Sequence, residues 1–353
     1  MEVLFFMNTR NDNSKILEIY KMKLFGELVK AVWNDDIEDI ENLPNKILNE
    51  DLKDNLNNYF SGKFDKDTMV NLIRVTMGLD VTEDTDKNLK ESLHEAVNLD
   101  EVKRPIISVI SDACKYCDEN NKEDESCKIR SKHINCNEED VCSACGDCVS
   151  RCKLGAISDK IEFIPMIKLL KDIQSPVYAI VAPAFVGQFG KDVSPGKLRT
   201  ALKKIGFEDM IEVALAADML TAKEAYDYYE HMKKDEEGCF ITSCCCPIWV
   251  SLIQNSFPQI LENVSPSVSP MIACGRAVKI LNPDAKVVFI GPCTAKKSEA
   301  AKKELKGAVD YVLTFEEIMA LFEAFDIDLA KCSNEDIDDA SIFGRGFGAA
   351  GGL

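Results

Sequence analysis

The sequence predicts a mixed α/β protein in which a cysteine-rich module precedes a domain built on a parallel sheet. Three observations predict this class: apolar residues three or four apart in the N-terminal part, closely spaced cysteines in the middle, and short apolar runs that alternate with helical segments from Pro176 onward. We expect a helical N-terminal region at 1–105, a metal-binding module at 106–165 and an α/β domain at 170–353.

The composition excludes several classes of protein. The 353 residues carry 42 basic and 60 acidic side chains, and the net charge of −18 repels nucleic acid and anionic lipid. No apolar run is long enough to span a bilayer, and Met1–Arg10 has no basic stretch ahead of its short apolar run, so we expect neither a membrane protein nor a secretory signal. We therefore expect a cytoplasmic protein, in which fifteen cysteines favour metal binding over disulfides.

The N-terminal region is predicted to be helical from Ser14 to about Asp100. Apolar residues recur three or four apart with charged residues between them, as in Ile16, Ile19, Tyr20, Leu24 and Leu28. This region contains no motif that carries chemistry, so we expect a helical lobe that packs on another part of the protein.

Eight of the cysteines lie between Cys114 and Cys152, where large apolar residues are few. Metal ligation supplies the folding free energy of such modules. The C-x2-C-x2-C-x3-C spacing of the last four is the bacterial ferredoxin pattern, and the eight together suffice for two 4Fe-4S clusters. The eight are Cys114, Cys117, Cys127, Cys136, Cys142, Cys145, Cys148 and Cys152.

Structural zinc is the alternative, because C-x2-C pairs also form zinc sites. Three thiols spaced by two residues and followed by Gly155-Ala156-Ile157 fit the ferredoxin pattern better than two separated pairs. His133 could replace Cys136 as a ligand, although a single histidine in a polar loop is more often only solvated.

The region after Pro176 is predicted to be an open α/β fold with a parallel sheet. Ser194 and Pro195 open a helix that ends at Gly206, with cap, first-position proline and terminal glycine in their usual places. In such folds, sites form at the carboxyl ends of the strands. Strands are expected at 177–181, 210–214, 240–242, 286–290 and 309–313.

Two capping boxes predict further helices in this region. Thr221 with Glu224 is expected to open a helix that reaches residue 234, and Thr314 with Glu317 a helix that reaches residue 325.

Two cysteine motifs follow predicted strands. The first is Thr242-Ser243-Cys244-Cys245-Cys246-Pro247-Ile248-Trp249, in which Pro247 can begin a helix. A helix amino terminus favours the thiolate form that a metal ligand requires. The second motif, directly after the strand at 286–290, is Gly291-Pro292-Cys293-Thr294-Ala295-Lys296-Lys297-Ser298-Glu299.

These motifs, behind a two-cluster ferredoxin-like segment, resemble the first two signatures of the iron-only (FeFe) hydrogenases, TSCCPxW and MPCxxKxxE. The resemblance covers roughly residues 106–353 and includes Ala182-Pro183-Ala184. It implies a hydrogenase-type catalytic domain and the reversible reduction of protons to dihydrogen. It also implies an H-cluster, in which a 4Fe-4S cubane is joined through a cysteine to a two-iron unit with carbonyl and cyanide ligands.

The same resemblance implies roles for individual residues. Cys246 and Cys293 would ligate the cubane, and Cys245 would pass protons to the two-iron unit. Because the motif has one extra cysteine, Cys244 and Cys245 are the alternative pair of proton carrier and ligand. Lys296 would place its ammonium against one cyanide. Around the other cyanide would lie Ala182, Pro183 and Ala184.

The resemblance also implies a proton path that leads to Cys245. A relay needs groups within hydrogen-bond or single-water reach, and carboxylates that alternate with hydroxyls and a thiol meet that need. Glu224 keeps a competing structural interpretation, because it also completes the capping box with Thr221. The residues implied in the path are Glu224, Asp227, Ser265 and Glu299.

Two features depart from the family pattern. Gly291 stands where the family has a methionine that packs over the two-iron unit, which opens space. The family's third signature supplies the last two cubane ligands, and the sequence does not reach it by Leu353. None of the remaining cysteines has its C-x3-C spacing, and we expect them to be small buried side chains: Cys239, Cys274 and Cys332. We therefore expect a truncated copy of a longer hydrogenase, a second chain that supplies the missing segment, or a protein that has lost hydrogen chemistry.

The leading hypothesis is a ferredoxin-dependent hydrogenase. The alternatives are a non-catalytic iron–sulfur protein similar to the cytosolic cluster-assembly relatives of hydrogenases, and a redox sensor or electron-transfer subunit. Ferredoxin is the expected electron partner, and maturation proteins are the expected source of the two-iron unit. An acidic partner would need a local basic patch, for which the candidates are Lys115, Lys128, Arg130, Lys132, Arg151 and Lys153.

Overall fold

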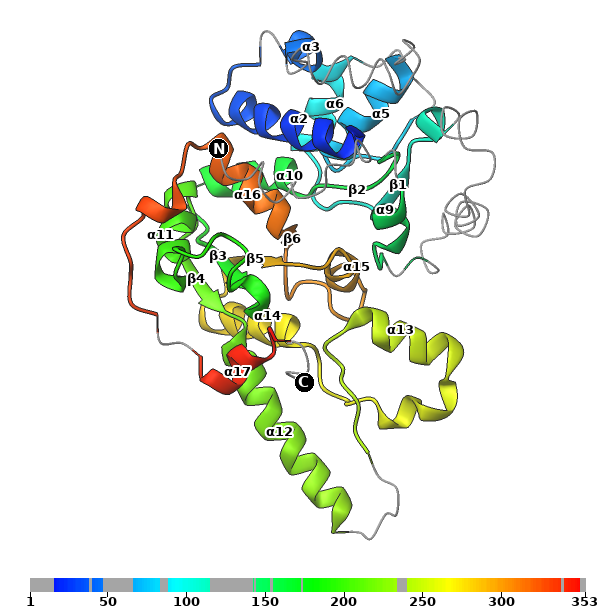
Figure 1. The fold of residues 1–353 in the computed structure, drawn as a ribbon, viewed down its shortest axis with the longest axis vertical. Coiled ribbons are helices and arrows are strands. Elements are labelled where there is room, and N and C mark those ends of the chain that lie inside the picture. Colours follow the sequence, from blue (N-terminus) through cyan, green and yellow to red (C-terminus); the bar gives the residue numbers. More distant parts are fainter. Residues whose placement is uncertain are drawn as a thin grey trace. The chain divides into compact units, whose positions relative to one another are not determined.

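The computed structural model describes residues 16–37, 40–46, 66–82, 88–114, 142, 144–152, 155–172, 174–233, 240–337 and 340–349 (Figure 1). The chain divides into two compact units. Unit 1 comprises Met1–Lys168 and Glu316–Asp326, and unit 2 comprises Leu169–Phe315 and Ile327–Leu353. No helix in the described ranges is both long enough and apolar enough to cross a membrane.

Unit 1 contains the predicted N-terminal helices and a short antiparallel pair of strands. Tyr20, Leu24 and Leu28 are fully buried on one face of the first helix, which confirms the predicted apolar stripe. The elements are α2 (Ile16–Trp33), η1 (Ile40–Asn42), α3 (Leu43–Lys46), α5 (Lys66–Thr76), α6 (Leu89–Val97), β1 (Ile107–Val109), α9 (Asp147–Arg151), β2 (Ile157–Asp159) and most of α10 (Phe163–Lys171).

A buried lysine joins the helical part of unit 1 to its strands. Lys21 on α2 is 3% exposed, and its ammonium donates to Ser158 Oγ at 2.8 Å and to the backbone and side chain of Asp159 on β2. A buried charge is tolerated only when it is paired and hydrogen-bonded, and this one is. The contact therefore links α2 to the strand that follows Cys152.

Unit 2 is built on a four-stranded sheet in which every neighbouring pair is parallel, in the order β4-β3-β5-β6. All four residues of β6 are buried, as are all of β5 except Lys286, as expected for a parallel sheet covered on both faces. The predicted mixed α/β class with a parallel sheet is confirmed. The strands are β3 (Val177–Val181), β4 (Asp209–Glu212), β5 (Lys286–Gly291) and β6 (Tyr311–Thr314).

Helices and short turns connect these strands. They are η4 (Pro183–Phe185), α11 (Pro195–Ile205), α12 (Ala214–Met232), α13 (Pro247–Ser256), η5 (Pro258–Asn263), α14 (Pro270–Leu281), α15 (Ala295–Ala300), η6 (Leu329–Lys331) and α17 (Ile342–Gly346). Helix α16 (Phe315–Ala324) follows β6 directly, at the position that the sequence predicts.

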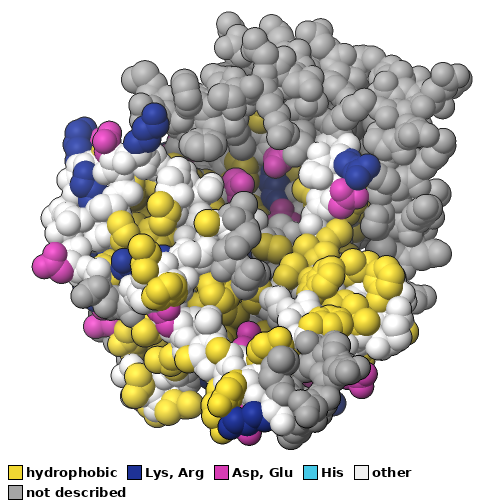
Figure 2. All heavy atoms as spheres, turned by 60° about the horizontal axis from the view of Figure 1, so that its bottom comes forward, with side chains coloured by type: hydrophobic (Ala, Val, Ile, Leu, Met, Phe, Trp, Pro, Cys, Tyr) yellow, Lys and Arg dark blue, Asp and Glu magenta, His cyan; other side chains and the backbone are white. Residues whose placement is uncertain are grey.

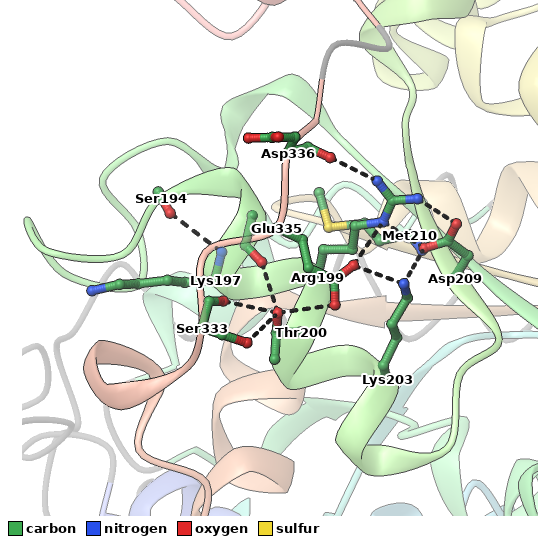
Figure 3. Close-up of polar contacts among 11 residues, drawn as sticks. Ser194, Lys197, Arg199, Thr200, Lys203, Asp209, Met210, Ser333, Glu335 and Asp336 are labelled. Atoms are coloured by element: carbon green, nitrogen blue, oxygen red, sulfur yellow. Dashed lines mark hydrogen bonds and ion pairs between the residues drawn. The ribbon is translucent and has the colours of Figure 1, made fainter.

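Helix α11 is also predicted correctly, and it anchors a later segment of the chain. Ser194 caps it through the N–H of Lys197, and Gly206 ends it in the left-handed region. Figure 3 shows that its polar side chains hold residues 333–336: Thr200 donates to the backbone oxygen of Ser333 at 2.8 Å, and Lys203 pairs with Glu335 at 2.8 Å. These contacts hold the segment after η6 against helix α11.

The structure corrects the predicted capping box of Thr221 with Glu224. Helix α12 begins at Ala214, directly after β4, because the run from Ala214 to Leu220 is rich in strong helix formers. Thr221 is therefore inside the helix, where its hydroxyl donates to the backbone oxygen of Ala217 at 2.8 Å. Glu224 therefore does not complete a capping box, and the structural interpretation that competed with a role in the proton path is removed.

The structure also corrects the predicted strand at 240–242. Only Thr242 makes a β-bridge, a single parallel one with Val264, and Phe240 and Ile241 lie outside any strand. One bridge leaves too few ladder hydrogen bonds for a strand of the main sheet. The first cysteine motif therefore begins after a loop and not at a strand end.

Candidate metal-cluster site

The described part of the cysteine-rich module holds several thiols close together. Cys148 is 6% exposed, and burial, together with the nearby thiols of Cys142 and Cys145, raises its pKa to about 11. Ala144 and Gly146 adopt positive φ angles of 51° and 79°, so the backbone wraps tightly between these thiols. Thiolates are the ligands of iron–sulfur clusters, and the wrap fits the ferredoxin pattern.

The remaining cysteines of this module are placed only in part. Cys152 accepts a hydrogen bond from the backbone N–H of Ile157 on β2 at 3.4 Å, and Cys114 is 7% exposed at the end of a helical turn. Among the described residues, no three His, Cys, Asp or Glu side chains converge closely enough for a single metal ion. Three predicted ligands lie outside the described residues, namely Cys117, Cys127 and Cys136, and so do His133 and Cys239. Of the predicted basic patch only Arg151 is described, and it pairs with Asp147.

In unit 2, one hydrogen-bonded chain connects three of the residues singled out from the sequence. The thiol of Cys244 donates to Glu224 Oε1 at 3.6 Å, and the hydroxyl of Ser265 donates to the same oxygen at 2.5 Å. Ser265 is 4% exposed and also accepts the N–H of Ser267 at 3.2 Å. Helix α12, the cysteine motif and the segment before α14 therefore meet at one carboxylate.

The position of Cys244 bears on the two possible registers of the cysteine motif. Burial and the carboxylate of Glu224 raise the pKa of the Cys244 thiol to about 11, so this thiol holds its proton at neutral pH. Cys245 instead accepts a hydrogen bond from the hydroxyl of Ser243 at 3.1 Å. Thus the thiol that donates to Glu224 is that of Cys244, as in the alternative register, whereas the sulfur of Cys245 accepts from Ser243.

A second group of contacts lies around the motif after β5. The Lys296 ammonium donates to the backbone oxygen of Cys245 at 2.7 Å and to Glu299 Oε2 at 2.7 Å, and Glu299 is 5% exposed. Cys293 lies near Cys246; burial and this neighbour raise its pKa, whereas backbone N–H groups at the start of α15 and the charge of Lys296 oppose the shift. The two motifs are therefore held together through Lys296.

The loop Ala182–Ala184 lies at the carboxyl end of β3, next to the end of β5. The N–H of Ala182 donates to the backbone oxygen of Ile290 at 2.8 Å. A Cβ at Gly348 would lie 2.6 Å from the backbone oxygen of Pro183, so Gly348, two residues after the end of α17, passes this loop at a distance that only glycine permits. These contacts place small side chains and backbone around one edge of the sheet.

Three more residues that the sequence singled out are described in unit 2. Asp227, three residues beyond Glu224 on α12, has a side chain that is 31% exposed and pairs with Lys223 at 2.6 Å. Cys274 and Cys332 are both 4% exposed, which confirms that they are small buried side chains. Sequence reasoning did not find the contact of Ser243 with Cys245 or that of Val268, whose backbone oxygen also accepts the Cys244 thiol at 3.6 Å.

Beyond the carboxyl end of β5 lie a thiol, an ammonium and the buried carboxylate of Glu299, and the chain also has a ferredoxin-type cysteine pattern. Together these features define an iron–sulfur protein of the redox class. Residues 175–353, half of the chain, match the family described as iron only hydrogenase large subunit, C-terminal domain. The chain belongs to this family.

Individual relatives agree with this assignment. The chain is 30% identical over 241 residues to the NADP-reducing hydrogenase subunit HndD of Solidesulfovibrio fructosivorans, covering 60% of this chain and 41% of that protein. It is 31% identical over 224 residues to iron hydrogenase 1 of Clostridium pasteurianum, covering 57% of this chain and 39% of that protein. The chain thus spans less than half the length of these curated relatives.

Two further similarities complete the comparison. The cytosolic Fe-S cluster assembly factor NAR1 of Meyerozyma guilliermondii is 25% identical over 233 residues, covering 58% of this chain and 44% of that protein. A solved structure of a variant of the [FeFe]-hydrogenase HydA1 from Chlamydomonas reinhardtii is 24% identical and covers 49% of each chain, with a TM-score of 0.44.

Proposed function

We propose that this protein takes part in the reversible reduction of two protons by two electrons to dihydrogen. The observation that carries the proposal is the hydrogen-bonded chain Cys244–Glu224–Ser265, which lies in the same unit as Cys246, Cys293 and Lys296. Membership of the iron-only hydrogenase family and the similarity to proteins named as hydrogenases support it.

The residues present fit part of an H-cluster site. Cys246 and Cys293 come from different segments and lie close enough for their thiols to interact, as two ligands of one cubane require. Lys296 brings a buried positive charge beside them, and Ala182–Ala184 offers small side chains near the end of β5. When bound, an H-cluster would supply the metal centre at which protons and electrons combine.

The protein's own contribution to such chemistry is the movement of protons. The carboxylate of Glu224 accepts hydrogen bonds from both Ser265 and Cys244, so it can take a proton on one side and release it on the other. Cys244 is the thiol at the end of this chain, and we propose it as the proton carrier in place of Cys245. Cys246 stays the proposed cubane ligand, so Cys245 takes neither role. Glu299, which binds the ammonium of Lys296, offers a second carboxylate for proton transfer. Asp227, which pairs with Lys223, would serve only the outer end of the path.

Electrons are proposed to reach unit 2 from 4Fe-4S clusters bound by the cysteines from Cys114 to Cys152, with ferredoxin as the donor, in the cytoplasm, and with maturation proteins as the source of the two-iron unit. The domain boundaries at 1–105, 106–165 and 170–353 are part of the same proposal. Positions 142–152 support it, because Cys142 and Cys145 lie near enough to Cys148 to help raise its pKa, and Cys152 accepts a backbone hydrogen bond.

A second candidate is a non-catalytic iron–sulfur protein that assembles or transfers clusters. The similarity to the cluster assembly factor NAR1 favours it. The ammonium of Lys296 is already bound to Glu299 and to the backbone of Cys245, which is a structural role that this candidate would retain without hydrogen chemistry.

Infrared spectroscopy separates the two candidates. The protein is matured anaerobically, its iron is counted, and carbonyl and cyanide stretching bands are sought on the same sample. Bands together with proton reduction support the hydrogenase, and bound iron without bands supports the second candidate.

Variants of the proton path provide a second test. Replacing Glu224 with Gln keeps the shape but removes the proton acceptor, and we expect proton reduction to fall about 100-fold or more. Asp227→Asn, three residues along the same helix, serves as the matched control and should lower the rate far less. Equal effects of the two changes would contradict the path through Glu224.

A further inference from the structure

The last residue of β5 has no side chain, and the space beside it is already filled. A Cβ at Gly291 would lie 2.5 Å from Phe289 Cε1 and 2.7 Å from Phe289 Cζ. Real Cβ atoms do not approach other atoms so closely, so the Phe289 ring occupies the position that any side chain at 291 would take. The absence of a side chain at Gly291 therefore leaves no open space next to Cys293.

Strand geometry explains how the two residues meet. Residues two apart on a strand project from the same face, so the ring of Phe289 extends along β5 toward its carboxyl end. Phe289 is 3% exposed and pairs in register with Ile180 and Val312, which belong to the strands on either side. The ring is confined by the sheet and cannot move away at little cost.

The same contact reaches the loop after β3. A Cβ at Gly291 would also lie 3.2 Å from the Cβ of Ala182, and Ala182 donates its N–H to Ile290. Phe289, Gly291 and Ala182 therefore form one packed contact between the ends of β3 and β5. From these two strand ends extend the Ala182–Ala184 loop and the motif with Cys293.

We propose that Phe289 is a positioning residue of this site. Its ring, packed into the side-chain space of Gly291, sets the distance between the Ala182–Ala184 loop and Cys293, and it closes this wall of the site to water. That the site binds a metal cluster rests on the proposed function, but the packing of Phe289 against Gly291 does not.

Thermal unfolding of the full chain without metal tests the packing. Gly291→Ala overpacks the contact and should lower the Tm by about 5 °C. Phe289→Ala makes room for the new methyl group, so adding Gly291→Ala to it should lower the Tm no further. Gly346→Ala is the matched control, because a Cβ there meets no atom within 4 Å, and it should leave the Tm unchanged. Additive effects of the two substitutions would overturn the proposed pairing.

Alkylation of Cys293, followed by mass spectrometry, tests the positioning role. Phe289→Ala opens the wall, so the alkylation rate of Cys293 should rise about tenfold or more. The rate at Cys332, which is buried elsewhere in unit 2, should not change. An unchanged rate at Cys293 would overturn the proposal even if the variant is less stable.

Infrared bands of the matured protein keep this inference distinct from the proposed function. If the wild-type protein shows carbonyl and cyanide bands, Phe289→Leu should shift their frequencies, and unshifted bands would contradict the positioning of a cluster. If the wild-type protein shows no bands, the proposed function fails, and the Tm coupling and the alkylation rate still decide the role of Phe289.

Discussion

The pair formed by Glu212 and Arg345 gives a prediction whose size follows from burial. Glu212, at the end of β4, is fully buried, and Arg345 on α17 donates two hydrogen bonds to its carboxylate at 2.8 and 2.9 Å. Arg345→Met would leave the carboxylate without these bonds. Loss of one partner from a buried pair costs about 3–5 kcal/mol, and we expect about 3 kcal/mol because the Arg345 side chain is 34% exposed.

Urea unfolding of the full chain without metal measures this loss. The matched control is Lys331→Met, which removes an ion pair with Asp328. The Lys331 side chain is 83% exposed and that of Asp328 is 50% exposed. Exposed pairs contribute little, so the control should leave the free energy of unfolding nearly unchanged. A loss below about 1 kcal/mol for Arg345→Met, or one equal to the control, would refute the reasoning from burial.

Two further predictions concern other paired charges. Lys21→Met removes the ammonium that joins α2 to β2 and should lower the free energy of unfolding of unit 1 by about 3 kcal/mol. Lys30→Met, which removes an exposed ion pair on the same helix, should have little effect. Local hydrogen exchange measures both changes. Burial would raise the pKa of Asp209, but the Arg199 guanidinium outweighs it and lowers this pKa. The folded state therefore binds this proton less readily, so the stabilisation is present above the usual carboxyl pKa and is lost as pH falls through the lowered value. Asp209→Asn should flatten the fall of the Tm as the pH drops below the usual carboxyl pKa, and an unchanged slope would contradict this prediction.

Much of the parallel sheet was predictable because local signals and tertiary packing agree there. Val177–Val181 is a continuous apolar run, and it forms β3 with the same bounds. Helix α11 lies where Ser194, Pro195 and Gly206 place its ends, because capping depends only on neighbouring residues. The cysteine motifs were visible for the same reason, since their spacing is local.

Two predicted elements were wrong, because in each case a local pattern did not decide the structure by itself. The Thr221 capping box is a valid pattern, but the helix formers from Ala214 onward extend the helix through it. The apolar residues at 240–242 have strand propensity but make a single bridge. Propensity does not show whether a neighbouring strand is available, which the tertiary structure decides.

The sequence by itself determined the class of the protein. The order of apolar runs and capping residues predicts a parallel α/β domain, and the types and spacing of its cysteines identify it as an iron–sulfur protein that resembles the iron-only hydrogenases.

Only the tertiary structure decided which of these residues meet. It placed Cys244 beside Glu224, bound Lys296 to the backbone of Cys245, and filled the space of Gly291 with the ring of Phe289. These contacts join segments that are far apart in the sequence or follow from side-chain packing in a buried layer. A sequence pattern gives only the spacing of residues along the chain, so it does not predict which side chains pack together in the interior.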